Sequence, residues 1–108
     1  MPKVVWITGE KYDFTRQNVD KSPDQDGVYG LVRGVEKIYV GGGNIRARLQ
    51  SDFRGENSCL KGEKSTHYYR EPMKDWTNRE KELIQAFDPV CNKKGRRTAP
   101  GPIISQKS

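Results

Sequence analysis

The chain has 108 residues, enough for one small domain with short ends. Hydrophobic residues make up only 32% and the mean hydropathy is -0.95, so the core must be small and the stability marginal. No apolar run approaches the roughly 20 residues that span a bilayer, and no signal peptide is visible, so no membrane association is expected.

The net charge of +6 is unevenly distributed. Residues 27–54 sum to +3 and residues 93–108 to +5, whereas residues 1–26 and 55–92 each sum to -1. A basic surplus of this kind points to a polyanionic partner, although basic tails are often merely solvated.

Metal-binding side chains of the zinc type are scarce. The chain has one histidine, His67, and two cysteines, Cys59 and Cys91, without CxxC spacing, so no zinc cluster is predicted. The cysteines are expected to pack as reduced thiols, with a disulfide as the alternative. His67 is expected to be a half-exposed strand residue.

The N-terminal quarter carries weak local signals. Residues 3–8 are predicted to form a short strand, and residues 12–19 show a weak helical pattern. Residues 22–26 are polar turn material that leads into the first strong signal.

Residues 28–32 and 37–40 are β-branched and aromatic runs that predict a β-hairpin. A two-residue loop would place Tyr29 and Tyr39 on opposite faces of the sheet. A three-residue loop over residues 34–36 would make them diagonal neighbours on one face. If the two tyrosines share a site, an odd-numbered loop is expected.

A basic helix follows the hairpin. Asn44 is a favourable N-cap, and Ile45, Leu49 and Phe53 recur at i, i+4 and i+8 as one apolar stripe. Residues 54–64 are expected to be irregular.

Two further elements are predicted. Residues 66–70 form a third strand with Tyr68 and Tyr69 on opposite faces, and residues 78–87 form a second helix that ends before Pro89. The domain is expected to span residues 1–94, followed by a basic, disordered tail over residues 95–108.

Several short motifs occur in a fixed order. Gly27-Val28-Tyr29 and Tyr39-Val40-Gly41 place their tyrosines ten residues apart, and Asn44-Ile45-x-x-Arg48-Leu49 follows. Glu80-x-x-Leu83-Ile84 and Pro89-x-x-Asn92 come later. Over residues 27–92 this order and spacing resemble the GIY-YIG endonuclease superfamily, as a small standalone catalytic domain. The resemblance implies an α/β (α+β) fold, a small three-stranded antiparallel sheet flanked by helices.

The resemblance implies that Glu80 holds a single divalent cation, Mg²⁺ or Mn²⁺. Mg²⁺ suits one carboxylate because it keeps most of its waters and also takes substrate phosphate oxygens. Thr77-x-x-Glu80 is also a capping box, in which the carboxylate would bond the backbone instead. The residues alone favour the cap, and the resemblance favours the metal.

The resemblance also assigns the other catalytic residues. Arg48 would hold the scissile phosphate, the alternative being a surface ion pair with Asp52. Tyr29 and Tyr39 would help to deprotonate water and to orient water or phosphate, the alternative being aromatics that fill a sheet surface. Asn92 would close the site through hydrogen bonds.

Nucleic-acid contacts are expected from Gly42, Gly43, Arg46 and Arg54. Two departures from the family pattern concern this region. Only Gly42 and Gly43 separate Gly41 from the helix cap, where the family usually has three residues, often including a lysine. Asp52 stands where the family often has His or Tyr, and an acidic group there could reach the metal or repel DNA.

The leading hypothesis is a divalent-metal-dependent endonuclease that hydrolyses phosphodiester bonds in DNA by water attack. The alternative is a catalytically weak module of the same fold that binds branched or damaged nucleic acid, and a third possibility is an interaction domain without nucleic acid. The partner is expected to be duplex or branched DNA, with a possible targeting protein. The protein is expected to be a monomer or homodimer in the cytoplasm, associated with the nucleoid.

Overall fold

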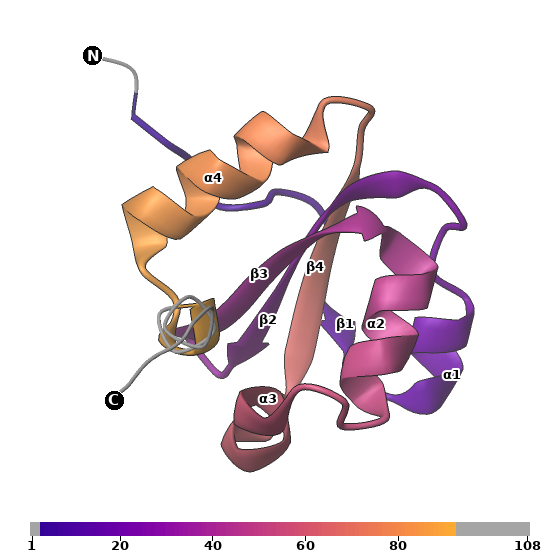
Figure 1. Ribbon diagram of the computed structural model, residues 1–108. Helices are drawn as coiled ribbons and strands as arrows, with labels where there is room; N and C mark the ends of the chain where they lie inside the picture. The colour runs from indigo at the N-terminus through magenta and orange to yellow at the C-terminus, as the bar shows by residue number, and fades with distance from the viewer. Residues whose placement is uncertain (1–2, 93–108) are drawn as a thin grey trace, which may run out of the picture.

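The computed structural model describes residues 3–92, which form an antiparallel sheet with the strand order β1-β4-β2-β3 (Figure 1). The strands are β1 Tyr12–Asp13, β2 Asp26–Arg33, β3 Glu36–Asn44 and β4 His67–Pro72. The mixed α+β fold was predicted correctly, but the sheet has four strands rather than three. The additional strand β1 is only two residues long, too short for an alternating pattern to be recognised.

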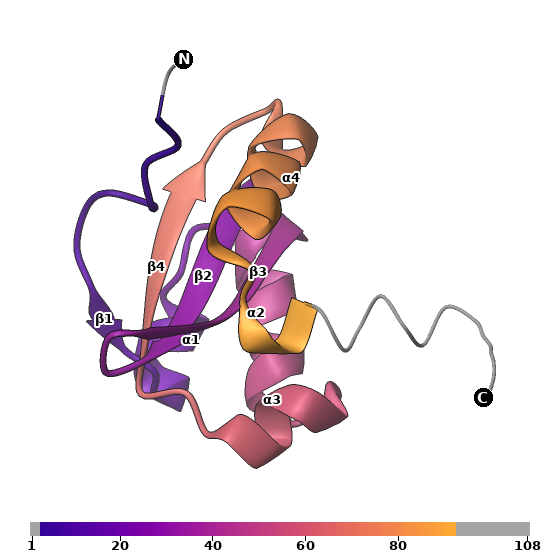
Figure 2. The same ribbon diagram turned by 90° about the vertical axis from the view of Figure 1, so that its left-hand side faces the viewer.

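Helices cover both faces of the sheet. They are α1 Arg16–Asp20, α2 Ile45–Phe53, α3 Ser58–Glu63 and α4 Trp76–Phe87. Figures 1 and 2 show α4 on one side of the sheet and α1, α2 and α3 on the other. None of the helices within residues 3–92 combines the length and apolar character that crossing a bilayer requires.

Each face of the sheet has its own apolar cluster. The buried residues on the α1–α3 side are Val19, Tyr29, Leu31, Ile38, Ile45, Leu49, Leu60, Tyr68 and Cys91. Those on the α4 side are Ile7, Val28, Val40 and Leu83. Alternation along β2 sends Val28 to the α4 side and Tyr29 to the other, as the period of two in a strand requires.

The hairpin places Tyr29 and Tyr39 on one face of the sheet, but through a β-bulge and not through a three-residue loop. Arg33 pairs with Glu36 across a two-residue turn, so the predicted three-residue loop is wrong. A β-bulge then inserts Ile38 as an extra residue in β3, and Leu31 pairs with Tyr39. Because a bulge adds one residue to one strand, it shifts the register as a longer loop would. Both tyrosines therefore lie on the α2 side.

The N-terminal segment differs from its prediction. Residues 3–8 belong to no strand of the sheet, and instead they lie beside α4, where the Arg79 guanidinium donates to the Val5 carbonyl at 2.8 Å. The Trp6 ring occupies the space over Gly30, where an added Cβ would lie 2.5 Å from it. The predicted helix over residues 12–19 is β1 followed by the shorter α1, which begins after the N-cap Thr15.

The elements after the hairpin follow the sequence more closely. The Asn44 side chain caps α2 by accepting from the Ala47 N–H at 2.9 Å, as predicted. The expectation of an irregular stretch over residues 54–64 is wrong, because Asn57 caps the short helix α3. Helix α4 ends at Phe87 as predicted but begins at Trp76, two residues before the predicted start.

The two cysteines form a disulfide, so the prediction of reduced thiols is wrong. Cys59 of α3 and Cys91, which follows α4, are joined with a Cα–Cα distance of 5.7 Å and a sequence separation of 32. Spacing rules based on CxxC do not detect such a pair, since the fold rather than the local sequence brings the residues together. The predicted boundary between domain and tail lies outside the described residues.

Candidate active site

Strand β3 lies at the edge of the sheet, with α2 on one side and α4 on the other (Figure 1). Tyr39 on β3, Arg48 on α2 and Glu80 on α4 lie close enough for their charges to influence one another. Burial raises the pKa of Tyr39 and of Glu80, the charge of Arg48 opposes the rise in both, and the charge of Glu80 adds to the rise in Tyr39. Three elements thus place a phenol, a guanidinium and a carboxylate around one edge strand.

The two tyrosines are adjacent but differ in exposure. Their ring centroids are 6.2 Å apart and the rings are tilted by 52°. Tyr29 is 0% exposed, whereas Tyr39 is only partly buried. Gly41 faces Tyr29 across the strand pair, and a Cβ on Gly41 would lie 2.4 Å from the Tyr29 hydroxyl oxygen. Tyr39 is therefore the phenol that solvent can reach, whereas Tyr29 is enclosed.

Asp52 is buried and points at Tyr29. The Tyr29 hydroxyl donates to Asp52 Oδ2 at 2.5 Å, and Asp52 is only 8% exposed. Burial raises the pKa of Asp52 to about 6, although the hydrogen bond from Tyr29 and the charge of Arg48 lower it. Within residues 3–92, Arg48 and Asp52 do not form the surface ion pair considered as the alternative.

Burial, followed by the charge of Asp52, raises the pKa of Tyr29 well above its ordinary value. The pKa of Tyr39 is raised by the same two causes, while Arg48 lowers it. Both phenols are accordingly protonated at neutral pH in the free protein.

Arg48 lies beside both phenols. The nearness of Tyr29 is the largest influence that raises its pKa, and Tyr39 contributes in the same direction. Gly43 has a φ of +116°, a conformation that favours glycine, and a Cβ there would lie 3.6 Å from Arg48 Cγ. The turn into α2 therefore leaves the Arg48 stem lying against the end of β3.

Glu80 does not complete a capping box. The N-cap of α4 is Asp75, so Thr77 lies inside the helix and the capping alternative is wrong. In the part of the chain that the structure describes, the Glu80 carboxylate has no hydrogen bond and no ion pair. Burial raises its pKa, and the charges of Arg48 and then Lys81 lower it.

Asn92 holds the free edge of β3. Its Nδ2 donates to the Val40 carbonyl and its Oδ1 accepts from the Val40 N–H, both at 2.8 Å. A side-chain amide can satisfy both backbone groups of an edge residue in this way. Asn92 thereby fixes the strand immediately after Tyr39.

The residues expected to contact nucleic acid are arranged less uniformly. Gly42 faces α4, where an added Cβ would lie 2.3 Å from the Trp76 ring, so this glycine permits close packing. Arg46 Nε donates to the Ser22 carbonyl at 2.8 Å, and Arg54 pairs with Glu56 at 2.9 Å on the surface. Only Gly43 lies directly beside Arg48, and the contacts of all four with nucleic acid remain predictions.

His67 has a local role, as expected from its position in a strand. Its Nε2 lies 3.0 Å from Asp13 Oδ1 and its Nδ1 lies 2.9 Å from Thr66 Oγ1. Asp13 is its partner in the pairing of β1 with β4, so the histidine supports that edge of the sheet.

Several solved structures resemble the fold of this chain. The GIY-YIG N-terminal endonuclease domain of UvrC from Thermotoga maritima, bound to its catalytic magnesium, matches with a TM-score of 0.65 and 22% identity over 71% of this chain and 93% of that chain. A point mutant of that domain with its catalytic divalent cation matches with a TM-score of 0.65 and 20% identity over 71% and 93%. The chain has the GIY-YIG fold.

No protein-family model matches the sequence, and no curated protein matches it. The fold is therefore recognised from the structure and from the short motifs, not from overall sequence similarity. The motifs lie on the elements that surround the β3 edge of the GIY-YIG fold.

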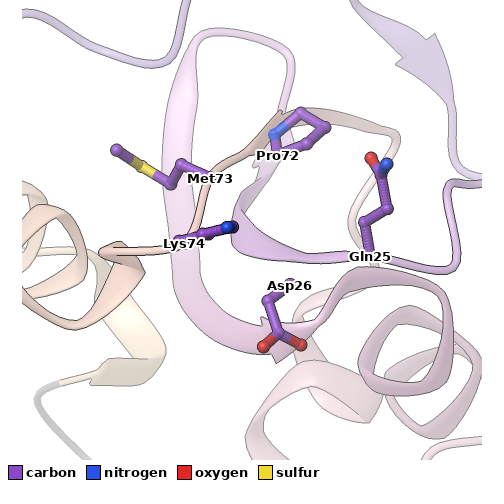
Figure 3. Close-up of a pocket in the computed structure, with 5 residues that line it drawn as sticks. All are labelled: Gln25, Asp26, Pro72, Met73 and Lys74. Carbon is purple, nitrogen blue, oxygen red and sulfur yellow. The ribbon is translucent and has the colours of Figure 1, made fainter.

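A pocket of about 500 Å³ is lined by a different set of residues (Figure 3). Its lining residues are Gln25, Asp26, Pro72, Met73 and Lys74, from the start of β2 and the end of β4. It contains none of the side chains that the motifs of the GIY-YIG fold single out, so the chemistry is not assigned to it.

Proposed function

We propose that the chain is a divalent-metal-dependent endonuclease that hydrolyses phosphodiester bonds in DNA. The observation that supports this most strongly is the meeting of Tyr39, Arg48 and Glu80 at the β3 edge. A phosphodiester bond requires a group that orients water, a cation that binds the phosphate and a carboxylate that can hold a metal ion. Each of these groups comes from a different element.

The cation fits Glu80. In the described part of the chain no cluster of three His, Cys, Asp or Glu side chains exists, which disfavours a fully protein-ligated metal. A half-buried carboxylate without a partner among these residues suits Mg²⁺ or Mn²⁺, which are held by one or two carboxylates together with water and phosphate oxygens. When bound, the cation supplies Lewis-acid stabilisation of negative charge on the phosphate.

Arg48 binds the phosphate in this proposal. Its guanidinium is charged at every accessible pH, and charge-assisted hydrogen bonds to phosphate oxygens are strong. During attack the negative charge on those oxygens grows, so Arg48 stabilises the transition state more than the ground state.

Tyr39 orients the attacking water. Because its pKa is raised, the phenol is neutral at rest and acts first as a hydrogen-bonding partner. To accept the water proton it would need a pKa lowered by more than three units, or about 4 kcal/mol. The positive charge of Arg48 acts in that direction. The product is expected to carry a 5′-phosphate, as in the nucleases the motifs resemble.

Asn92 positions Tyr39 through the backbone of Val40. Tyr29 does not reach the substrate in this proposal but lies behind Tyr39 and Arg48. The chain acts on duplex or branched DNA as a monomer or homodimer, and a targeting protein supplies any further specificity.

A second candidate function is DNA binding without efficient cleavage. The raised pKa values of Tyr29 and Tyr39 favour it, since neither phenol is poised to accept a proton in the free protein. A binding module making about five phosphate contacts would lose roughly 10²- to 10³-fold in affinity between 50 and 200 mM salt, with or without Mg²⁺.

The test is cleavage of supercoiled plasmid and of a branched duplex with Mg²⁺, Mn²⁺ or EDTA. Glu80→Ala is compared with Glu82→Ala, which removes an exposed carboxylate two residues further along the same helix. We expect metal-dependent nicking by the wild type and by Glu82→Ala, and none by Glu80→Ala at an unchanged melting temperature. Salt-sensitive binding without cleavage by the wild type would favour the second function.

A further inference from the structure

Asp52 is a buried carboxylate for which the proposed reaction has no direct use. It lies one helical turn after Arg48 on α2, and its Oδ2 accepts a hydrogen bond from the Tyr29 hydroxyl at 2.5 Å. Within residues 3–92 this is the single hydrogen bond of its side chain, and the side chain forms no ion pair there. Burying a charge with one hydrogen-bond partner is costly. This cost indicates that Asp52 has a role that a neutral residue cannot fill.

A carboxylate and a neutral partner differ in the hydrogen-bond direction that they impose on the Tyr29 hydroxyl. An ionised carboxylate only accepts hydrogen bonds, whereas an amide can donate as well as accept. Opposite the ionised Asp52, the Tyr29 hydroxyl must therefore act as the hydrogen-bond donor. Its oxygen then keeps only lone pairs for its other neighbours.

Arg48 is the neighbour that needs an acceptor. A guanidinium only donates, and the nearness of Tyr29 is the strongest influence on the pKa of Arg48. Tyr29 itself is 0% exposed and has no solvent to complete its hydrogen bonding. A hydrogen bond with Tyr29 is among the influences that raise the pKa of Arg48, and in such a bond the guanidinium can only donate to the Tyr29 oxygen.

We infer that Asp52 is a positioning residue for Arg48. By accepting from Tyr29, it turns the Tyr29 oxygen toward the guanidinium and so orients Arg48 for the scissile phosphate. This inference rests on the proposed nuclease function and goes beyond it, because it assigns the buried pair Tyr29 and Asp52 to phosphate positioning rather than to proton transfer.

The orientation depends on the charge of Asp52. Once protonated, Asp52 can donate to Tyr29 instead, and the Tyr29 proton then points at a guanidinium that offers only protons. The groups that act on its pKa are Tyr29, Arg48 and Glu56, and its own charge acts on Tyr39. A pocket of about 310 Å³ that Asp52 lines also contains the cations Arg54, Lys61 and Lys64. On the α1 side, Arg16 and Asp20 line a neighbouring pocket with Arg54.

The experiment compares Asp52→Asn, Tyr29→Phe and the double variant with the wild type in steady-state DNA cleavage between pH 5 and 8. Asp52→Asn keeps the size of the side chain, so folding is expected to survive, but its amide can also donate to Tyr29 and no longer forces the Tyr29 hydroxyl to donate to residue 52. The matched control is Asp20→Asn, since Asp20 accepts a hydrogen bond from Gln50 of α2 at 3.1 Å and lies outside the site.

We expect Asp52→Asn to lower kcat by about 10- to 100-fold with little change in KM, as a small misplacement of a reacting group does. Tyr29→Phe should have a similar effect, and the double variant should be no slower than Tyr29→Phe alone. The loss of wild-type activity below about pH 6 should be absent in Tyr29→Phe. Asp20→Asn should leave kcat unchanged.

A second measurement needs no activity. In protein labelled with ¹³Cζ-tyrosine, the Tyr29 signal, identified by its absence in Tyr29→Phe, should shift with a midpoint near pH 6 and stop doing so in Asp52→Asn. A Tyr29 signal that does not respond to Asp52 would overturn the inference.

Equal kcat in wild type and Asp52→Asn would also overturn the inference and leave the nuclease proposal intact. Additive losses in the double variant would assign Asp52 a separate, structural role. If the wild type cleaves nothing, the nuclease function fails, and the reaction role of Asp52 fails with it even where the tyrosine signal responds.

Discussion

Two buried tyrosines in one apolar cluster have different kinds of hydrogen-bond partner for their hydroxyl groups. Tyr68 of β4 and Tyr29 of β2 are both 0% exposed, and both lie on the α1–α3 side of the sheet. The Tyr68 hydroxyl lies 3.0 Å from Ser22 Oγ and 3.0 Å from the Asn18 carbonyl oxygen, which are neutral groups. The Tyr29 hydroxyl donates to the carboxylate of Asp52 instead.

The difference shows that a buried phenol in this protein does not need a charged partner. A neutral hydroxyl and a carbonyl satisfy Tyr68 at little cost, because a hydrogen-bonded polar group is tolerated in a core. The Asp52 carboxylate must be desolvated, which its raised pKa reflects. The charged partner of Tyr29 thus costs stability, as residues of functional sites often do. The following predictions test this difference between the surroundings of Tyr29 and Tyr68.

The largest effect is expected from Arg48→Ala. Losing the guanidinium should slow DNA cleavage by about 10²- to 10³-fold, the usual effect of removing one group that stabilises transition-state charge. Arg54→Ala removes a guanidinium that pairs with Glu56 on the surface, and its effect should be confined to a modest rise in KM. Initial rates over a range of DNA concentrations distinguish the two. Equal losses in kcat would contradict the distinction between the site and the surface.

Next in size is removal of the disulfide. Cys59→Ser with Cys91→Ser should lower the free energy of unfolding by about 2–5 kcal/mol, since the bond closes a loop with a separation of 32 residues. Urea denaturation with and without a reductant measures this. Asn92 adjoins Cys91, so activity should fall at temperatures where the fold persists. An unchanged midpoint would show that the bond adds no stability.

The disulfide also bears on location. Disulfides persist mainly in oxidising compartments. The bond therefore weighs against the predicted cytoplasmic location, which stays a prediction.

Asp52→Asn should change how stability depends on pH. The pKa of Asp52 is about 6 in the folded protein and near 3.9 in an unfolded chain, so the folded state binds this proton more tightly. The stabilisation is complete below about pH 4 and is lost as the pH rises through 6. Relative to the wild type, Asp52→Asn should therefore gain up to about 3 kcal/mol between pH 4 and pH 7. Parallel stability curves for the two proteins would show that Asp52 carries no such cost.

The smallest effect, and the closest comparison, comes from Tyr29→Phe beside Tyr68→Phe. Each variant removes one buried hydroxyl, and each should lose about 1 kcal/mol of stability, with more from Tyr29→Phe because Asp52 is left without a partner. Only Tyr29→Phe should slow cleavage, by about 10-fold or more. Thermal melts and cleavage rates of the pair test this, and a similar loss of rate in Tyr68→Phe would remove the contrast.

The sequence predicted those parts of the fold that local patterns determine. Asn44 as an N-cap and the end of α4 at Phe87 were predicted, whereas a shared face for Tyr29 and Tyr39 was predicted only on the condition of an odd-numbered loop. The sequence could not indicate the bulge at Ile38, because an inserted residue and a longer loop give the same register. It could not indicate the disulfide either, since the contact joins residues that no short spacing connects.

The candidate site was predicted as a set of residues but not as an arrangement. The sequence does not decide the role of Asp52, although this residue lies at i+7 from Ile45 and at i+3 from Leu49, on the buried side of α2. The i, i+4, i+8 pattern places Phe53 in the apolar stripe, yet its side chain is 39% exposed. A polar residue at a position with core periodicity was the available signal, and its partner Tyr29 became visible only in three dimensions.

The central proposal is that a divalent cation, a phosphate-binding arginine and a phenol share the β3 edge, and paramagnetic broadening by Mn²⁺ tests it most directly. Amide signals of ¹⁵N-labelled protein are followed as Mn²⁺ is added to the wild type and to Glu80→Ala. We predict selective broadening at Gly41–Gly43 and in the first two turns of α4, lost in Glu80→Ala. Broadening centred on the opposite edge of the sheet, around Asp13 and His67, or broadening unchanged in Glu80→Ala, would contradict the proposal.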